Sequence, residues 1–334
     1  MTDVKPDKAK FFLDESFLNG DRMEISQERF EDYLLARNAI SSLYKVENLF
    51  SLCAMSFIEL ESLLAVASIE YMAGEYDGEE FTGRSGILRD KLNLKIVALL
   101  TTFRAYKDQC GQRLKGVNAF SADAALNMKA EFSKVFDASL EHRIMEGLRN
   151  YAQHADLPLY GTTYSHANQW RNDNPHADEP SRHRITINPY FSAKELINSE
   201  IRKSTRDDIS SLNLGKLDAK ILIRKYVADF AECHTVLKNS TEWIVDHAGA
   251  YIEDAYVTFS RIKGSEAKFI ELQKECADGE VESFHLRREN PVEVKKLRAR
   301  WGALTRSVRA FVSSEPVFEK DTYLGSDTSL WVPK

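Results

Sequence analysis

Apolar residues recur at steps of three and four along most of the chain, which predicts a mainly helical protein. In the first half, these stripes predict four helices over residues 26–38, 40–72, 85–114 and 122–155. The last of them has an apolar stripe without a gap: Met128, Phe132, Phe136, Leu140, Ile144, Leu148 and Tyr151. Short loops join the helices, so we expect an antiparallel bundle.

The pattern changes at Pro158, where a segment rich in Asn, His, Pro and Asp begins. Strand-like stretches at residues 160–164 and 183–188 predict a β-hairpin with a long polar tip. Beyond it we expect a short helix at 192–197, a linker at 198–213, a helix over 215–247, one or two helices over 251–276, a strand at 281–288 and a last helix from Pro291 to about Arg306.

This pattern divides the chain into three parts. Residues 1–160 hold the helical bundle, preceded by a polar arm over residues 1–22. Residues 161–190 form the hairpin, and residues 191–334 form a second helical region whose role the pattern does not indicate.

Composition describes an ordinary soluble protein, with 43% hydrophobic and 29% charged residues. A formal charge of −6 argues against a protein that coats nucleic acid, although a small cleft can still be basic. Residues 284–309 carry eight Lys or Arg and two Glu. This run is either an RNA footprint or a solvated helix face beside acidic neighbours.

The cysteines and the N-terminus indicate a cytoplasmic protein. The four cysteines are far apart, form no C-x-x-C and fall in helical patterns, which is typical of core thiols in a reducing compartment. The first residues contain no apolar signal region, and no stretch approaches 18 uninterrupted apolar residues. We therefore expect no membrane association.

The richest chemistry lies at the end of the fourth predicted helix, where Arg149, Asn150 and His154 precede Pro158. Arginine offers a permanent, planar charge that suits phosphate, and histidine can give or take a proton near neutral pH. Arg149 would hold a scissile phosphate, Asn150 would orient the imidazole or bind the phosphate, and His154 would move a proton. Because RNA supplies its own 2′-OH nucleophile, this chemistry requires no metal and no cofactor.

Helical geometry separates the two key side chains. At about 100° per residue, Arg149 and His154 point about 140° apart. Either the helix frays at His154, next to Pro158, or two chains each contribute a motif to one cleft in a symmetric homodimer. Glu146, Gln153 and Tyr151 are the expected supporting residues. The alternative is a helix end whose Arg and His only solvate the surface.

Other titratable residues give weaker signals. His166, His176 and His183 share the hairpin, but a zinc site would need a fourth ligand and no Cys is nearby, so we expect a solvated or substrate-facing loop. His142 and Arg143 are expected on a solvated face, and His234 and His247 in the core or on the surface. The phosphate-loop, dinucleotide, lipase and zinc-protease motifs are all missing from the sequence.

The string L-R-N-Y-A-Q-H-A-D-L-P resembles the R-x4-6-H motif of the HEPN superfamily (higher eukaryotes and prokaryotes nucleotide-binding domain). The resemblance covers roughly residues 25–160, and Arg149, Asn150 and His154 match the motif position by position. It implies a four- or five-helix bundle and a metal-independent endoribonuclease that acts as a dimer, typically in toxin–antitoxin or phage-defence systems.

The resemblance also bears on partners. A toxic ribonuclease would need an antitoxin or another regulatory protein. One subclass, paired with a nucleotidyltransferase antitoxin, carries H-x-Y, whereas Asp156 stands at that position here. The two other hypotheses are a non-catalytic HEPN-like module that binds RNA, a nucleotide or a protein, and a purely structural helical protein.

Overall fold

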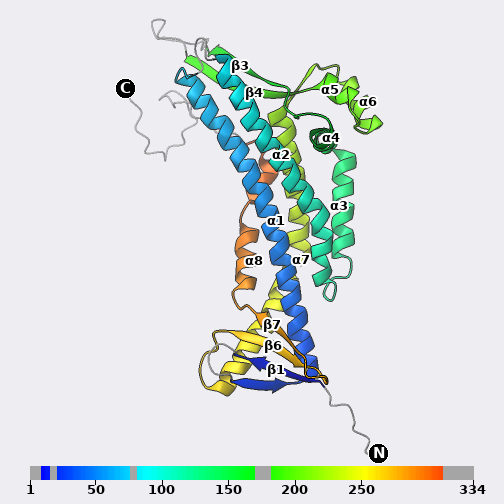
Figure 1. The fold of residues 1–334 in the computed structure, drawn as a ribbon, viewed down its shortest axis with the longest axis vertical. Helices are drawn as coiled ribbons and strands as arrows, with labels where there is room; N and C mark the ends of the chain where they lie inside the picture. Colours follow the sequence, from blue (N-terminus) through cyan, green and yellow to red (C-terminus); the bar gives the residue numbers. More distant parts are fainter. Residues whose placement is uncertain (1–8, 16–20, 76–80, 170–181, 311–334) are drawn as a thin grey trace, which may run out of the picture.

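The computed structural model describes residues 9–15, 21–75, 81–169 and 182–310, and it shows a mainly helical protein. The long helices are α1 (Gln27–Met72), α2 (Phe81–Arg113) and α7 (Ala219–Lys263). Helices α1 and α7 run the length of the molecule, with a small antiparallel sheet at each end (Figure 1). The shorter helices are α3 (Ala124–Ala138), α4 (Leu140–His154), α5 (Ala193–Asn198), α6 (Lys203–Ser211) and α8 (Asn290–Ala299), with 3₁₀ turns η2 (Leu114–Val117) and η3 (Gly302–Arg306).

Two of the long helices are longer than the sequence pattern predicts. The predicted break near Asn38 is wrong. Helix α1, which has 46 residues, continues through this position with Ala36, Ala39 and Ile40 buried. The expected end near residue 247 was also wrong, since α7 continues to Lys263 and ends at Gly264, whose φ of 75° suits a residue without a side chain.

The fourth predicted helix is two helices. The chain leaves helical geometry at Ser139, whose φ and ψ are −114° and 114°. The Ser139 hydroxyl accepts a hydrogen bond from the His142 amide at 3.1 Å, so it caps the N-terminus of α4. As a result α4 turns away from the axis of α3, and Figure 1 shows it nearly end-on.

The sheet at the lower end of Figure 1 has the strand order β2-β1-β6-β7. It corrects two expectations: part of the predicted polar arm forms strands, and so does part of the segment 251–276 that was expected to be helical. The predicted strand at 281–288 is confirmed. The four strands are β1 (Lys10–Asp14), β2 (Arg22–Ile25), β6 (Ile270–Glu275) and β7 (Val281–Leu286).

The sheet at the other end confirms the predicted hairpin. Strands β3 (Gly161–Gln169) and β4 (Arg182–Ser192) pair antiparallel, and β5 (Lys216–Asp218) adds a third strand. The short helix α5 follows as expected, whereas the predicted linker contains α6.

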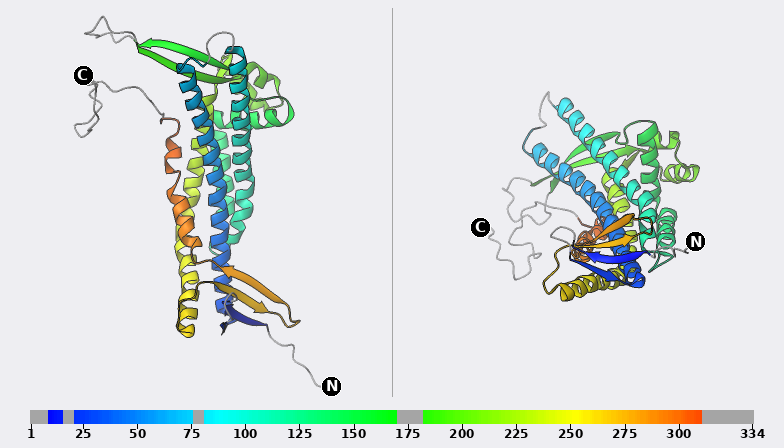
Figure 2. Two further views of the ribbon diagram at one scale, coloured as in Figure 1. Left: turned by 60° about the vertical axis from the view of Figure 1, so that its left-hand side comes forward. Right: turned by 60° about the horizontal axis from the view of Figure 1, so that its bottom comes forward.

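One hydrophobic core runs through the molecule, from Leu13 in β1 to Val294 in α8. Helix α7, from the C-terminal part of the sequence, lies against α1 within this core, as both views of Figure 2 show. The bundle is therefore built from both halves of the chain, and the division at residues 160 and 190 stays a prediction. By length and composition, α1 is apolar enough to cross a membrane, although a core helix of a soluble protein passes the same test.

Candidate functional site

Helix α4 carries the R-N-x-x-x-H motif and lies across the bundle, against α7, α2, α3 and α6. Its apolar face is buried through Ile144, Met145 and Leu148. Gly147 faces Ile201 in the loop between α5 and α6. These contacts fix the rotation of α4 about its axis. As a result, Asn150, Gln153 and His154 near its C-terminus are exposed to solvent.

Arg149 is half-buried and bonds its sequence neighbour. Its Nη1 donates to Asn150 Oδ1 at 3.1 Å. Its Nε is buried without a hydrogen-bond partner among the described residues. Within that part of the chain Arg149 forms no ion pair, whereas the nearby Arg104 and Arg143 each bind a carboxylate. A buried donor without a partner costs about 1–3 kcal/mol, which is a feature that an anionic ligand would explain.

His154 lies in the last turn of α4 and is exposed, as are Asn150 and Gln153. Because α4 remains helical through His154, the chain does not fray there, and the first of the two predicted ways of joining Arg149 to His154 is not found. No hydrogen bond or ion pair joins these two side chains within the described residues. The described part of one chain therefore does not join Arg149 to His154 directly.

Glu146 is the best-connected supporting residue. It accepts a hydrogen bond from the Tyr226 hydroxyl at 3.1 Å, and it lies 3.3 Å from Lys107 Nζ and 3.6 Å from Arg104 Nη1. Burial alone would raise the pKa of Glu146, but the charge of Lys107 and the other interactions of this carboxylate together outweigh it, and the net shift is downward. Glu146 is thus an ionised anchor between α2, α4 and α7.

Tyr151, the other predicted supporting residue, is half-buried. Burial raises the pKa of its hydroxyl, and the carboxylates of Asp156 and Glu195 add to the shift. Its hydroxyl therefore stays protonated at neutral pH.

His142 corrects the sequence prediction of a solvated face. It is 1% exposed, and its ring lies between Tyr226 and Phe230 at centroid distances of 4.9 and 5.1 Å. Its Nδ1 is 3.7 Å from Asp229 Oδ2, and Lys225 binds the other oxygen of that carboxylate. Burial would raise the pKa of Asp229, but its contacts with His142, Lys225 and Ser139 together outweigh burial, so the net pKa is below its ordinary value.

His234 is a core residue, one of the two positions expected for it. It is stacked on Phe50 at a centroid distance of 3.9 Å and lies 2.9 Å from both Glu47 Oε2 and the Tyr106 hydroxyl. His247 is exposed on α7 and contacts the ring of Phe120 edge-on.

Four of the eight cations in the basic run at residues 284–309 pair with carboxylates in the structure. Lys295 pairs with Asp246, and Arg298 pairs with both Glu47 and Glu242. Arg288 and Lys296 are also paired. This arrangement favours a solvated helix face over an RNA footprint.

The side chains of the hairpin histidines lie outside the part of the chain that the structure describes. His176 lies outside the described residues, and the side chains of His166 and His183 do as well. Among the residues that the structure describes, no three His, Cys, Asp or Glu side chains form a group that could hold a metal ion.

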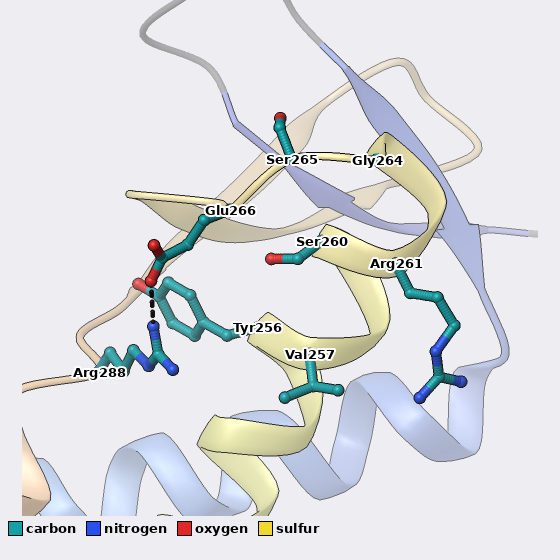
Figure 3. A pocket seen from close by; sticks show the side chains of 8 residues that line it. All are labelled: Tyr256, Val257, Ser260, Arg261, Gly264, Ser265, Glu266 and Arg288. Atoms are coloured by element: carbon teal, nitrogen blue, oxygen red, sulfur yellow. Dashed lines mark hydrogen bonds and ion pairs between the residues drawn. The ribbon is translucent and has the colours of Figure 1, made fainter.

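A shallow pocket lies at the far end of α7, where Tyr256 and Ser260 face Arg288 and Glu266 (Figure 3). Arg288 Nη1 is 2.9 Å from Glu266 Oε1, and Nη2 is 2.6 Å from a Glu253 oxygen. The guanidinium of Arg288 therefore forms ion pairs with two carboxylates. At 1.5 Å per residue along α7, this pocket is about 45 Å from the level of Tyr226, where α4 packs. The pocket and the motif are therefore separate features.

No protein-family model, curated protein or solved structure matches the chain. A functional interpretation of Arg149, Asn150 and His154 therefore depends on the motif and its surroundings in this molecule.

Proposed function

We propose that the protein is a metal-independent endoribonuclease of the HEPN type, whose active site forms when two copies bring their motifs into one cleft. The observation that carries the proposal is the state of the motif in one chain. Arg149 is half-buried without a carboxylate partner in the described part of the chain, and His154 is exposed on the last turn of the same helix. Both groups are thus available to a ligand, although one chain does not join them.

The chemistry follows from these side chains. The 2′-oxygen of the RNA attacks the adjacent phosphorus and gives up its proton to a base. The bond to the 5′-oxygen breaks, and that oxygen takes a proton from an acid, which leaves a 2′,3′-cyclic phosphate and a 5′-hydroxyl. One His154 can serve as base and the second as acid. Arg149 would bind the phosphate and stabilise its developing charge, and Asn150 would position the phosphate or the imidazole.

The surroundings of the motif support an anionic substrate. Lys107 and Arg104 reach α4 from α2, and Glu146 is the carboxylate that both of them bind. Arg202 lies beside them, with its guanidinium 4.6 Å from the centre of the Phe136 ring. Arg104 also binds Asp108 at 2.6 Å, so these two cations meet two carboxylates, and Arg202 adds one positive charge beside them.

The biological setting that we propose is a cytoplasmic toxin or phage-defence effector, active as a homodimer and restrained by an antitoxin or another regulatory protein. This setting rests on the resemblance of the motif to HEPN ribonucleases.

One observation favours the alternative of a non-catalytic HEPN-like module that binds RNA, a nucleotide or a protein. The Arg149 side chain already bonds Asn150, and an intact α4 keeps His154 on another side of the helix. A monomer of this kind could bind phosphate through Arg149 without cleaving it.

A cleavage assay on total RNA with EDTA separates the two functions. We expect the wild type to produce 2′,3′-cyclic phosphate ends, and Arg149→Ala and His154→Ala each to reduce the rate at least about 100-fold, because each removes a transition-state interaction. Arg261→Ala and His247→Ala, which change exposed residues of the same types on α7, should cut at the wild-type rate.

Two outcomes would contradict the proposal. If no variant cuts RNA and expression of the wild type does not slow growth, the catalytic function is wrong and the binding module is favoured. If all the variants cut equally, the activity belongs to another site or to a contaminant.

A further inference from the structure

An apolar stripe on the outer face of α1 is uncovered over its C-terminal part. Met55, Ile58, Val66, Ile69 and Met72 recur there, and between 41% and 64% of each residue is exposed. At about 100° per residue, the five side chains fall within an arc of about 120°. Ser62 is exposed within the same arc, and the rest of this surface is apolar. An apolar patch of this kind is uncommon on a soluble monomer unless something binds it.

Nearer the N-terminus of α1, helix α8 and Trp301 cover the same face. Arg298 of α8 donates to Glu47 at 2.9 Å, and the Trp301 indole nitrogen donates to Ser51 Oγ at 3.1 Å. Glu47 and Ser51 are both buried. Ile69 lies five helical turns beyond Ser51, at about 3.6 residues per turn, so it is on the same line along the helix.

The described part of the chain runs along this face and ends beside the bare stripe. From β7 it passes through α8 and then η3 toward the upper end of α1 (Figure 1). Ser307 donates to the Arg224 carbonyl of α7 at 2.8 Å, and Arg224 in turn binds Glu61 of α1 through two hydrogen bonds of 2.7 Å. Glu61 lies between Met55 and Met72, so the described chain ends, at Ala310, level with the middle of the bare stripe.

The sequence that follows Ala310 has the composition and length to cover the stripe. The bare stripe is about 26 Å long at 1.5 Å per residue, whereas an extended chain covers about 3.3 Å with each residue. Residues 311–334 contain nine large apolar or aromatic residues: Phe311, Val312, Val317, Phe318, Tyr323, Leu324, Leu330, Trp331 and Val332.

We propose that residues 311–334 bind along the bare stripe of α1 and continue the cover that α8 and Trp301 begin. This occupant accounts for the high apolarity of α1. The opposite side of the helix is packed within the bundle through Leu60 and Leu64, and the Glu61–Arg224 ion pair lies beside the stripe, so a lipid environment around the whole helix does not suit α1.

Thiol labelling in full-length protein tests the proposal. In a Cys276→Ser background the other three cysteines are buried, so Ile69→Cys provides a single accessible thiol in the stripe. Leu126→Cys on α3, which replaces a residue 65% exposed, is the matched control. We expect Ile69→Cys to react at least about tenfold more slowly than Leu126→Cys. Removal of residues 311–334 should make the two rates equal and leave the Leu126→Cys rate unchanged.

A photo-crosslinking residue at position 69 gives a second test that leaves the tail intact. We expect a crosslink to a peptide from residues 311–334 within one chain. Protection of Ile69→Cys that disappears on dilution but survives the deletion would show a second copy on the stripe. Protection that appears only with phosphatidylcholine vesicles would show a bilayer, and equal rates in the full chain would show an open surface. Each of these three results would overturn the proposal.

Discussion

His234 is the centre of a hydrogen-bonded chain of side chains that crosses the bundle. Its two ring nitrogens contact Glu47 and Tyr106, and Glu47 also accepts from Arg298 of α8 at 2.9 Å. Burial lowers the pKa of His234 and raises that of Tyr106, so the imidazole is neutral and the phenol keeps its proton. A carboxylate can only accept, so the imidazole donates from Nε2 to Glu47 and accepts the Tyr106 proton at Nδ1.

This geometry makes Glu47 the residue on which the buried charges depend. We expect Glu47→Gln to lower the free energy of unfolding by about 3 kcal/mol, because it leaves the buried Arg298 cation without its buried counterion. Urea denaturation measures the change. The matched control is Glu242→Gln, which removes the other carboxylate of Arg298. Because the Glu242 side chain is 54% exposed, that loss should be about 1 kcal/mol or less. Equal losses in the two variants would contradict this account.

At the scale of elements, the position of α4 depends on close approach at one residue. Gly147 lies in the middle of α4, where glycine costs about 1 kcal/mol relative to alanine. A Cβ there would lie 2.9 Å from Ile201 Cγ2, closer than side chains pack. The absence of a side chain lets the loop before α6 lie against α4.

Gly147→Ala should therefore destabilise the protein by about 1–3 kcal/mol despite the better helix propensity, since the added methyl overpacks the contact with Ile201. Gly111→Ala is the control, because it lies within α2 and a Cβ there meets nothing within 4 Å. That change should be neutral or stabilise by about 0.5–1 kcal/mol. Thermal denaturation of both variants measures the difference, and a stabilised Gly147→Ala would rule out the close contact.

The elements also show how far hydrophobic periodicity can predict this molecule. It predicts the helical class, the hairpin and the position of the motif, because those depend on local pattern. It misses the break at Ser139, since the apolar stripe continues across it and the cap is visible only when the backbone turns. It also misses the buried state of His142, because the Tyr226 and Phe230 rings that enclose it come from α7, far away in sequence.

At the scale of the whole molecule, three carboxylates, two of them buried, join the two halves of the chain. Glu47 of α1 bonds His234 and Arg298, and Glu146 of α4 bonds Tyr226 of α7. Asp229 of α7 lies beside His142 of α4. These contacts lie in a single hydrophobic core, so we expect the loss of any one of them to lower the stability of both halves together.

This arrangement predicts an acid-sensitive fold. Interactions in the folded protein lower the pKa of Glu47 and Glu146 below the ordinary 4.5, and that of Asp229 below 3.8. As the pH falls, the unfolded chain therefore takes up protons first, and the stability from these carboxylates, present above their ordinary pKa, is lost through and below that range. His234 acts in the same direction, since its pKa is lowered from 6.5 and the unfolded chain again protonates first.

Urea denaturation at half-unit steps from pH 8 to pH 3 should thus show a steady free energy of unfolding between pH 8 and 7. It should then decrease from about pH 6.5 and more steeply below about pH 4.5, by at most about 1.4 kcal/mol per pH unit for each group. His234→Gln should remove the part of the decrease between about pH 6.5 and 5 and leave the steeper part in place, because the carboxylates remain. A stability that stays constant or rises from pH 7 to 4 would show that these buried groups do not hold the two halves of the chain together.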